Sequence, residues 1–365
     1  MVQEGIAGRV AESIPAAMTQ AQVANGIGLT PEKFSRALND KRAFSAVELA
    51  KLSEVLHVDV HWLITGDPDP YRLVVAARHD FDAATGQRQV PGRRADQTHL
   101  DDVTLAYKQA FQAWTPDPVE LPNSAQQIRE QLGPQFVRRL AERLESHLGV
   151  DVIRLPQLTT AYSFHVGPRK VIVIPATGNW FRENWSIAHE LGHLAAAHHA
   201  DDPTPTERDR QESVANAFAA DLLLPAEQMR HIDWQTITAP ELADRIWDLG
   251  VSTDALNTRL RWLGVAVSPT VSDLLSLRTQ TLLRRHWANQ HTDGVDLITE
   301  RMDQAASRRF PRKLEEAHLD LIAVGAIRKH TLAWMLGIDP DALEVEEPSP
   351  PESLDIDSLA SLLAH

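Results

Sequence analysis

The stretch His189-Glu190-Leu191-Gly192-His193 constrains the fold of this chain more than any other. Residues four apart on an α-helix return to nearly the same face, so His189 and His193 can reach one metal ion if a helix runs through them. Glu190 would then lie beside the metal without binding it, where it can take a proton from an attacking water. Apolar residues continue on both sides with no proline, which predicts that helix. The pattern is typical of zinc peptidases, with an exposed polar helix as the alternative.

A catalytic zinc ion usually takes three protein ligands, and the absence of cysteine leaves His, Asp or Glu for the third. Residues 212–225 predict a second helix, with an apolar surface and Pro225 as its stop. We predict that Glu212, at the start of this helix, is the third ligand. Asn216, one turn later, is predicted to orient a ligand by hydrogen bonding. The alternative for Glu212 is a surface glutamate at a helix N-terminus.

These two elements resemble the ImmA/IrrE family of metallopeptidases, in which an HELGH helix precedes a helix with Glu and the pattern ANxFAAxLLxP. The matching segments here are His189 to His193 and Glu212 to Pro225, and the resemblance covers roughly residues 124–267. Residues 251–260 are similar to the helix that follows the zinc site in the family. The resemblance implies a zincin-like domain with Zn²⁺, and a cytoplasmic endopeptidase that inactivates a repressor protein.

Other polar residues lie around the motif. Tyr162 and His165 precede the apolar run 171–174, which predicts a buried or edge strand that could pair with an extended substrate. Either side chain could donate to a tetrahedral oxyanion, although both are also ordinary strand residues. His198 and His199 are interpreted as a polar helix end, with His198 pointing away from the metal.

The amino-terminal region carries an independent signal. A short helix is predicted from Thr19, a turn follows at residues 25–29, and Thr30 with Pro31 is a favourable helix start. Ser45 and Glu48 form a capping-box pattern before a third helix. Residues 9–66 resemble the phage-repressor (Cro/CI, or XRE) helix-turn-helix domain.

In that family the second helix of the motif enters the major groove of DNA. The resemblance therefore implies that Lys33, Ser35 and Arg36 lie near bases, with Gln20 close to phosphate or a base edge. Residues 1–66 hold six lysines and arginines against seven acids, so a general basic excess is lacking. Four of the six cluster between Lys33 and Arg42, which favours a local DNA-facing patch. The alternative is a protein-interaction or dimerisation module, and a homodimer is compatible with this chain.

Composition and the predicted segment boundaries indicate the domain organisation. The 365 residues, 43% hydrophobic, suffice for two or three domains, and the net charge of -14 argues against wholesale binding of nucleic acid or anionic membranes. We expect a mainly α fold with a small β-sheet (α+β), without disulfides or membrane spans, in the cytoplasm. The predicted segments are a helix-turn-helix domain at 1–67, a linker at 68–100, the peptidase domain at 101–267, a helical region at 268–343, and an acidic tail at 344–365. Helices are predicted at 101–113 and 124–148, and a short amphipathic helix at 354–363.

Two functions fit these features best. The first is a zinc endopeptidase that cleaves a repressor or antitoxin, directed to operator DNA or to that protein by its helix-turn-helix. The second is a transcriptional regulator or antitoxin whose peptidase-like domain binds a toxin or ligand without cleaving it. A hydrolase acting on a small metabolite has little support. Glu190 favours the first function, because a pure binding module needs no proton acceptor.

Overall fold

The computed structural model describes residues 5–15, 18–56, 58–67, 75–77, 80–82, 87–89, 93–198 and 204–348. The chain divides into two compact units, residues 1–72 and residues 73–365, close to the predicted domain end at residue 67. Among these described residues, no helix is long and apolar enough to cross a membrane.

The first unit is entirely helical. Its helices are α1 (Ile6–Glu12), α2 (Gln20–Gly26), α3 (Pro31–Leu38), α4 (Ala46–Leu56) and α5 (Val60–Thr65). The predicted caps are present: Thr30 Oγ1 accepts from the backbone N–H of Lys33 at 3.4 Å, and the backbone N–H of Ser45 donates to Glu48 at 2.8 Å. The helices pack around one apolar core that includes Val23, Phe34, Leu52 and Leu63. The local sequence signals therefore place α2, α3 and α4 correctly.

The second unit is built on a four-stranded sheet. Its strands are β1 (Val75–Ala77), β4 (Val150–Leu155), β5 (Tyr162–Val166) and β6 (Arg169–Pro175), in the order β1-β5-β6-β4. β4 runs parallel to β6, whereas β5 is antiparallel to both of its neighbours. The run predicted as a strand is therefore the inner strand β6, and β5 has β1 on its outer edge.

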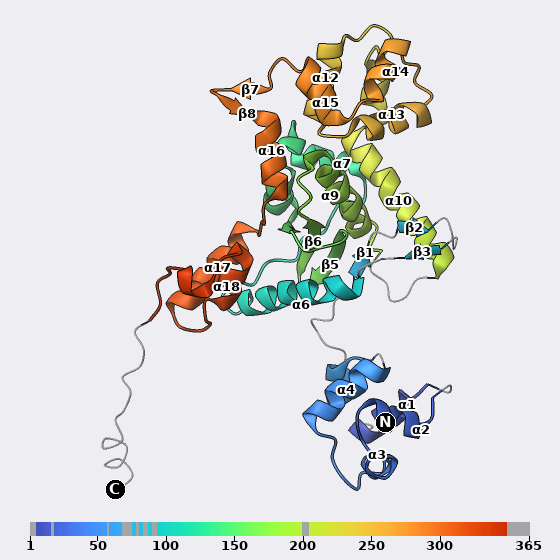
Figure 1. The fold of residues 1–365 in the computed structure, drawn as a ribbon, viewed down its shortest axis with the longest axis vertical. Coiled ribbons are helices and arrows are strands. Elements are labelled where there is room, and N and C mark those ends of the chain that lie inside the picture. The colour runs from blue at the N-terminus through green and yellow to red at the C-terminus, as the bar shows by residue number, and fades with distance from the viewer. Residues whose placement is uncertain are drawn as a thin grey trace. The chain divides into compact units, whose positions relative to one another are not determined.

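Both faces of the sheet are buried, so its strands alternate between two cores. Val152 and Ile172 lie in one core with α9 (Trp180–Ala195), whereas Ile153 and Val173 lie in the other with α6 (Arg93–Ala110). Because successive side chains of a strand point to opposite faces, a nearly continuous apolar run supplies side chains to both cores. The sheet thus forms the middle layer between helices (Figure 1).

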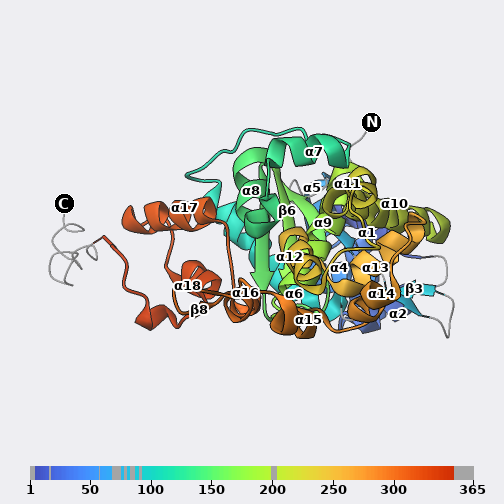
Figure 2. The same cartoon turned by 90° about the horizontal axis from the view of Figure 1, so that it is seen from above.

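The remaining helices continue these two layers. Around the first core lie α7 (Ala125–Leu132), α8 (Leu140–Arg143), α10 (Pro205–Leu223), α11 (Ala226–His231), α12 (Ala239–Leu249), α13 (Thr253–Trp262), α14 (Pro269–Leu275), α15 (Thr279–His286) and α16 (Leu297–Ala306). The second core receives α17 (Arg312–Ala323) and α18 (His330–Leu336), which lie away from α12–α15 (Figures 1 and 2). Short elements complete the unit: η1 (Phe136–Arg139), η2 (Leu144–Leu148), η3 (Pro340–Ala342), and the hairpins β2 (Asp80–Asp82) with β3 (Gln87–Gln89) and β7 (His291–Thr292) with β8 (Val295–Asp296). This helical architecture with small sheets agrees with the expected α+β class.

Several boundaries differ from the sequence prediction. The helix predicted at 101–113 is α6, which begins at Arg93, so the expected linker at 68–100 contains β1, β2, β3 and the first turns of α6. The helix predicted at 124–148 is broken into α7, η1, α8 and η2, because Gly133 adopts φ +74° and Pro134 follows it. The helix predicted at 354–363 lies outside the described residues.

A glycine after α12 helps to fix α9 in the first core. Gly250 has φ +61°, and its carbonyl oxygen accepts a hydrogen bond from Asn184 Nδ2 of α9 at 2.9 Å. A Cβ at Gly250 would lie 2.3 Å from Val137 Cγ1 and 2.7 Å from Asn184 Nδ2. Gly264 has a similar φ of +65° with no atom within 4 Å of such a Cβ.

We therefore expect Gly250→Ala to lower the free energy of unfolding by about 1–3 kcal/mol more than Gly264→Ala, because overpacking adds to the same backbone strain. Chemical denaturation followed by tryptophan fluorescence measures the difference. Equal losses in the two variants would contradict a tight contact at Gly250.

Candidate metal centre

The helix of the HExxH motif is α9, and its start is determined locally. The side chain of Asn179 accepts from the backbone N–H of Arg182 at 3.2 Å and so caps the helix. Farther along, Glu183 forms a buried ion pair with Arg154 of β4, with Arg154 Nε donating to Glu183 at 2.8 Å. The ion pair anchors the first half of α9 to the sheet, and the motif follows in the second half of the same helix.

The helix of the third candidate ligand is α10. It begins at Pro205, after a capping box between Thr204 and Glu207, and therefore starts earlier than the sequence prediction. Glu212 is buried in the interior of α10 and is not a surface residue at the helix start. The earlier start follows from the Thr-Pro pair, a common helix start that the prediction did not use.

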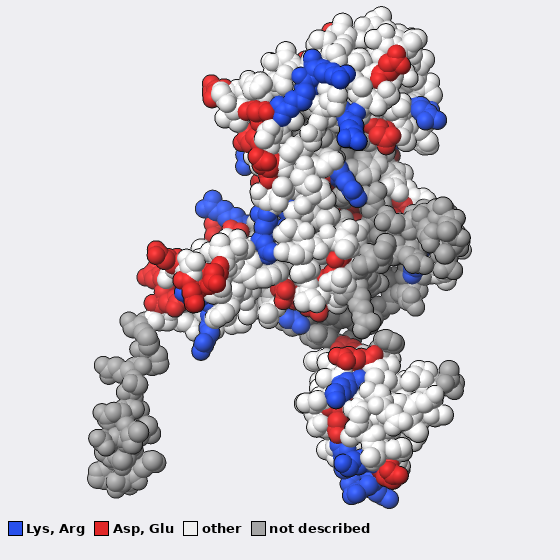
Figure 3. All heavy atoms as spheres, in the orientation of Figure 1, with Lys and Arg blue, Asp and Glu red and all other residues white. Residues whose placement is uncertain are grey.

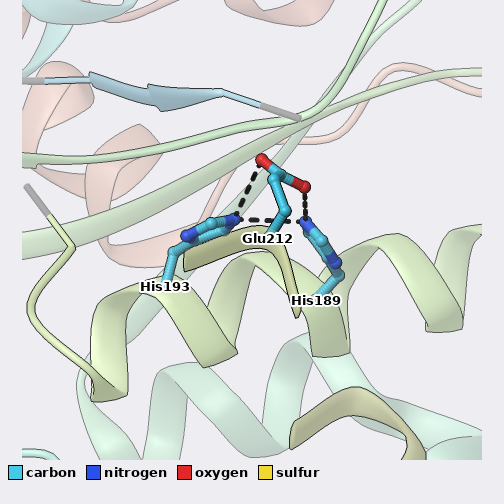
Figure 4. Close-up of side chains that lie close together, drawn as sticks. All are labelled: His189, His193 and Glu212. Carbon is cyan, nitrogen blue, oxygen red and sulfur yellow. Dashed lines mark hydrogen bonds and ion pairs between the residues drawn. The ribbon is translucent and has the colours of Figure 1, made fainter. Parts of the chain in front are cut away.

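The three candidate ligands meet at one point. His189 Nε2 lies 3.3 Å from one carboxylate oxygen of Glu212, and His193 Nε2 lies 3.7 Å from the other. The two Nε2 atoms are 3.2 Å apart, and one ligand atom from each residue falls within 4.8 Å of the others (Figure 4). All three side chains are buried. Two imidazoles and a carboxylate are a donor set that suits Zn²⁺, and a dication would balance the buried negative charge.

The outer ring nitrogen of each histidine is held by a further polar group. His189 Nδ1 lies 3.1 Å from Asn216 Oδ1, as the sequence predicted for Asn216. An amide oxygen can only accept, so His189 Nδ1 carries the proton and Nε2 is left with a lone pair facing the site. Asn216 therefore sets the tautomer that a metal ligand needs.

His198 performs the corresponding role for His193, which the sequence prediction missed. Its Nδ1 lies 3.1 Å from His193 Nδ1, and burial lowers the pKa of His198, which favours a neutral ring able to accept a hydrogen bond. The contact arises because α9 ends in a turn with Ala197 at φ +52°, in which the backbone N–H of His198 donates to the carbonyl of His193 at 3.0 Å. The polar helix end thus supports a candidate ligand, while His199 lies outside the described residues.

Glu190 is fully buried beside the candidate ligands. Ser163 Oγ of β5 donates to Glu190 Oε2 at 2.7 Å. No local pattern predicts this contact, because a serine within an apolar strand has no preferred partner until the sheet packs on α9. Ser163 therefore orients the carboxylate that does not belong to the ligand set.

Tyr162 and His165 occupy different faces of β5. The Tyr162 hydroxyl donates to Asp96 of α6 at 2.7 Å, and its ring is buried in the core on the α6 side. His165 shares the strand face of Ser163, and burial together with Lys170 lowers its pKa. Of the two proposed oxyanion donors, only His165 stays on the side of the sheet that carries Glu190.

Gly192 lets α9 and α10 approach closely. A Cβ at this position would lie 3.1 Å from Ala215 Cα and 3.1 Å from Phe218 Cβ. Both neighbours belong to α10, the helix that carries Glu212. The glycine inside the motif therefore brings the third candidate ligand within reach of the two histidines.

The residues predicted to contact DNA lie in the first unit. Gln20 at the start of α2 is exposed, as are Lys33, Ser35 and Arg36 along α3. Arg42 is partly buried and paired with Glu48, so it contributes less free charge than the sequence cluster suggests. Figure 3 shows basic side chains gathered at the end of this unit where Figure 1 places α3.

We expect the purified full chain to hold about one zinc ion, and His193→Ala or Glu212→Ala to lose most of it, because two remaining ligands form an incomplete site. Metal analysis by mass spectrometry after dialysis measures the zinc content. His231→Ala and Glu227→Ala remove the same residue types from the exposed surface of α11 and should keep full occupancy. Full occupancy in both ligand variants would exclude this site.

Comparison with known proteins agrees with this geometry. A search of curated proteins and a search of solved structures gave no match. The family model of the IrrE N-terminal-like domain, a metallopeptidase domain, matches residues 145–261, which include β4, β5, β6, α9 and α10. This part of the chain, with all three candidate ligands and Glu190, is thus similar to the ImmA/IrrE metallopeptidases.

Proposed function

We propose that this chain is a zinc-dependent endopeptidase that cleaves a repressor or antitoxin protein. The observation that carries the proposal is the buried set of His189, His193 and Glu212 with Glu190 next to it in the sequence. The similarity of residues 145–261 to a metallopeptidase domain supports the same reaction class.

Each residue has a distinct task in this reaction. His189, His193 and Glu212 would hold the zinc ion, which when bound supplies a Lewis acid and activates water for attack on a peptide carbonyl. Glu190 takes the proton from the attacking water and transfers it to the leaving amine, so it acts first as base and then as acid. Ser163 fixes one oxygen of this carboxylate, which leaves the group in a defined orientation for both transfers.

Burial strengthens these interactions. His189 and Glu190 are fully buried and His193 nearly so, which lowers the local dielectric around the proton transfers. The hydrogen bond from His189 Nδ1 to Asn216 keeps the imidazole from rotating. A binding module without catalysis would need none of the proton chemistry at Glu190.

Glu190→Gln is expected to keep the zinc content and to slow cleavage about a hundredfold to ten-thousandfold, because the amide cannot accept the proton. The test is to express the intact chain or the variant together with the repressor or antitoxin encoded beside it, and to follow that protein by immunoblot. Glu227→Gln, an exposed substitution of the same type, should cleave like the intact chain.

The result separates the enzyme from a regulator. Fragments that appear with the intact chain and Glu227→Gln, but not with Glu190→Gln, support the peptidase. If Glu190→Gln reproduces every phenotype and no fragment forms, the peptidase proposal is wrong and a regulator that binds its partner without cleaving it takes its place.

The first unit is proposed to direct the peptidase to operator DNA as a helix-turn-helix. The support is that α2 and α3 follow one another across a short turn and that α3 exposes Lys33, Ser35 and Arg36. Such a helix fits the major groove, with its charged side chains toward bases and phosphates. Thr30 and Pro31 fix the start of α3, so these side chains are held on an ordered helix.

Lys33→Ala with Arg36→Ala should weaken binding to the promoter region of the chain's own gene and reduce its salt dependence, since two phosphate or base contacts are lost. Fluorescence anisotropy at several salt concentrations measures both effects. Lys313→Ala with Arg328→Ala removes the same charge from exposed positions of the second unit and serves as the control. No binding by the intact chain at low salt would point to a protein-interaction module.

A further inference from the structure

The outer edge of β5 is already occupied by a segment of the same chain. β1 pairs with it antiparallel in the register Val75 with Phe164, Ala76 with Ser163 and Ala77 with Tyr162. The other edge of β5 pairs with β6, so both of its edges are in use. β1 begins a few residues after the boundary between the two compact units at residues 72 and 73.

This pairing lies at the candidate metal centre. Ala76 is opposite Ser163, and the hydroxyl of Ser163 donates to Glu190. β1 also contacts α9, the helix that carries His189 and His193. The backbone of residues 75–77 therefore runs next to the groups proposed to cleave a peptide.

An exposed strand edge binds an extended peptide through its row of backbone N–H and carbonyl groups. The edge next to a peptidase centre is where such a peptide would place a bond beside Glu190. The strand β1 pairs with the backbone N–H and carbonyl groups of this β5 edge as such a peptide would, because it is extended and antiparallel to β5. A second peptide cannot pair there until β1 leaves.

We propose that β1, near the start of the second unit, is an internal occupant of the peptide-binding edge and restrains the peptidase until an extended substrate segment displaces it. The inference rests on the proposed peptidase function. A strand of three residues forms few hydrogen bonds, so a longer unfolded segment of a partner protein can replace it. The substrate class that follows is an extended, locally unfolded stretch of a protein rather than a folded surface.

Binding tests the occupancy without relying on catalysis. The full chain carrying Glu190→Gln is compared with the same chain carrying Val75→Pro and Ala76→Pro in addition. The probe is a fluorescein-labelled peptide with the sequence of residues 71–82, measured by fluorescence anisotropy. We expect the double-proline chain to bind it about tenfold more tightly or better, because proline removes backbone donors from the ladder and frees the edge of β5.

The two single proline variants form a matched pair. In an antiparallel pair, neighbouring residues direct their N–H groups to opposite sides, so only one of Val75 and Ala76 donates to β5. One single variant should behave like the double variant and the other like the intact chain. Equal affinity of the intact and double-proline chains, or binding by neither, would overturn the occupancy.

Cleavage then separates this inference from the proposed function. With Glu190 restored and zinc supplied, the double-proline chain should cleave the 71–82 peptide about tenfold faster than the intact chain. A gain in binding without any cleavage leaves the occupancy standing and refutes the peptidase. Cleavage at equal rates by both chains supports the peptidase and refutes restraint by β1.

Discussion

The close approach of α9 and α10 is the constraint on which the candidate centre depends. A Cβ at Gly192 would lie 3.1 Å from Ala215 Cα and 3.1 Å from Phe218 Cβ of α10, which is closer than most contacts of a Cβ. The two histidines are on one helix and Glu212 is on the other, so the separation of the helices decides whether the three groups can share a metal ion. The glycine between Leu191 and His193 therefore favours the close helix approach on which the candidate ligand set depends.

The sheet supplies the second support of the centre. Its two buried faces lock the strands between layers, and the ion pair of Arg154 with Glu183 ties β4 to α9. A buried ion pair contributes little net stability, but its directional hydrogen bonds favour one arrangement of helix and strand. The same packing places Ser163 of β5 against Glu190. The position of the catalytic candidate is thus determined from both the helix and the sheet.

Around the candidate ligands, polar contacts orient the two imidazoles. Asn216 and His198 each engage an outer nitrogen, which directs both Nε2 atoms inward. One partner comes from α10 and the other from the turn after α9, so the two histidines are oriented by separate elements. Such outer contacts commonly govern metal affinity nearly as much as the ligands do. The proposed restraint by β1 would act at another level, because the pairing of β1 with β5 concerns access to the centre rather than its chemistry.

Local sequence determined most of the helices and the candidate site residues, whereas tertiary packing decided which side chains contact one another. The spacing of His189 and His193, the stop at Pro225 and the caps at Thr30 and Ser45 act within a few residues, so the helices and the candidate metal ligands could be predicted. The partners of Ser163, Tyr162 and His198 depend on strand faces and turns that only the packed chain defines. The pairing of residues 75–77 with β5 joins segments far apart in the sequence, and no local pattern specifies its register. Local sequence therefore predicted the candidate reactive groups and their helix, while the tertiary structure decided how these groups are oriented and which strand pairs with the neighbouring edge of β5.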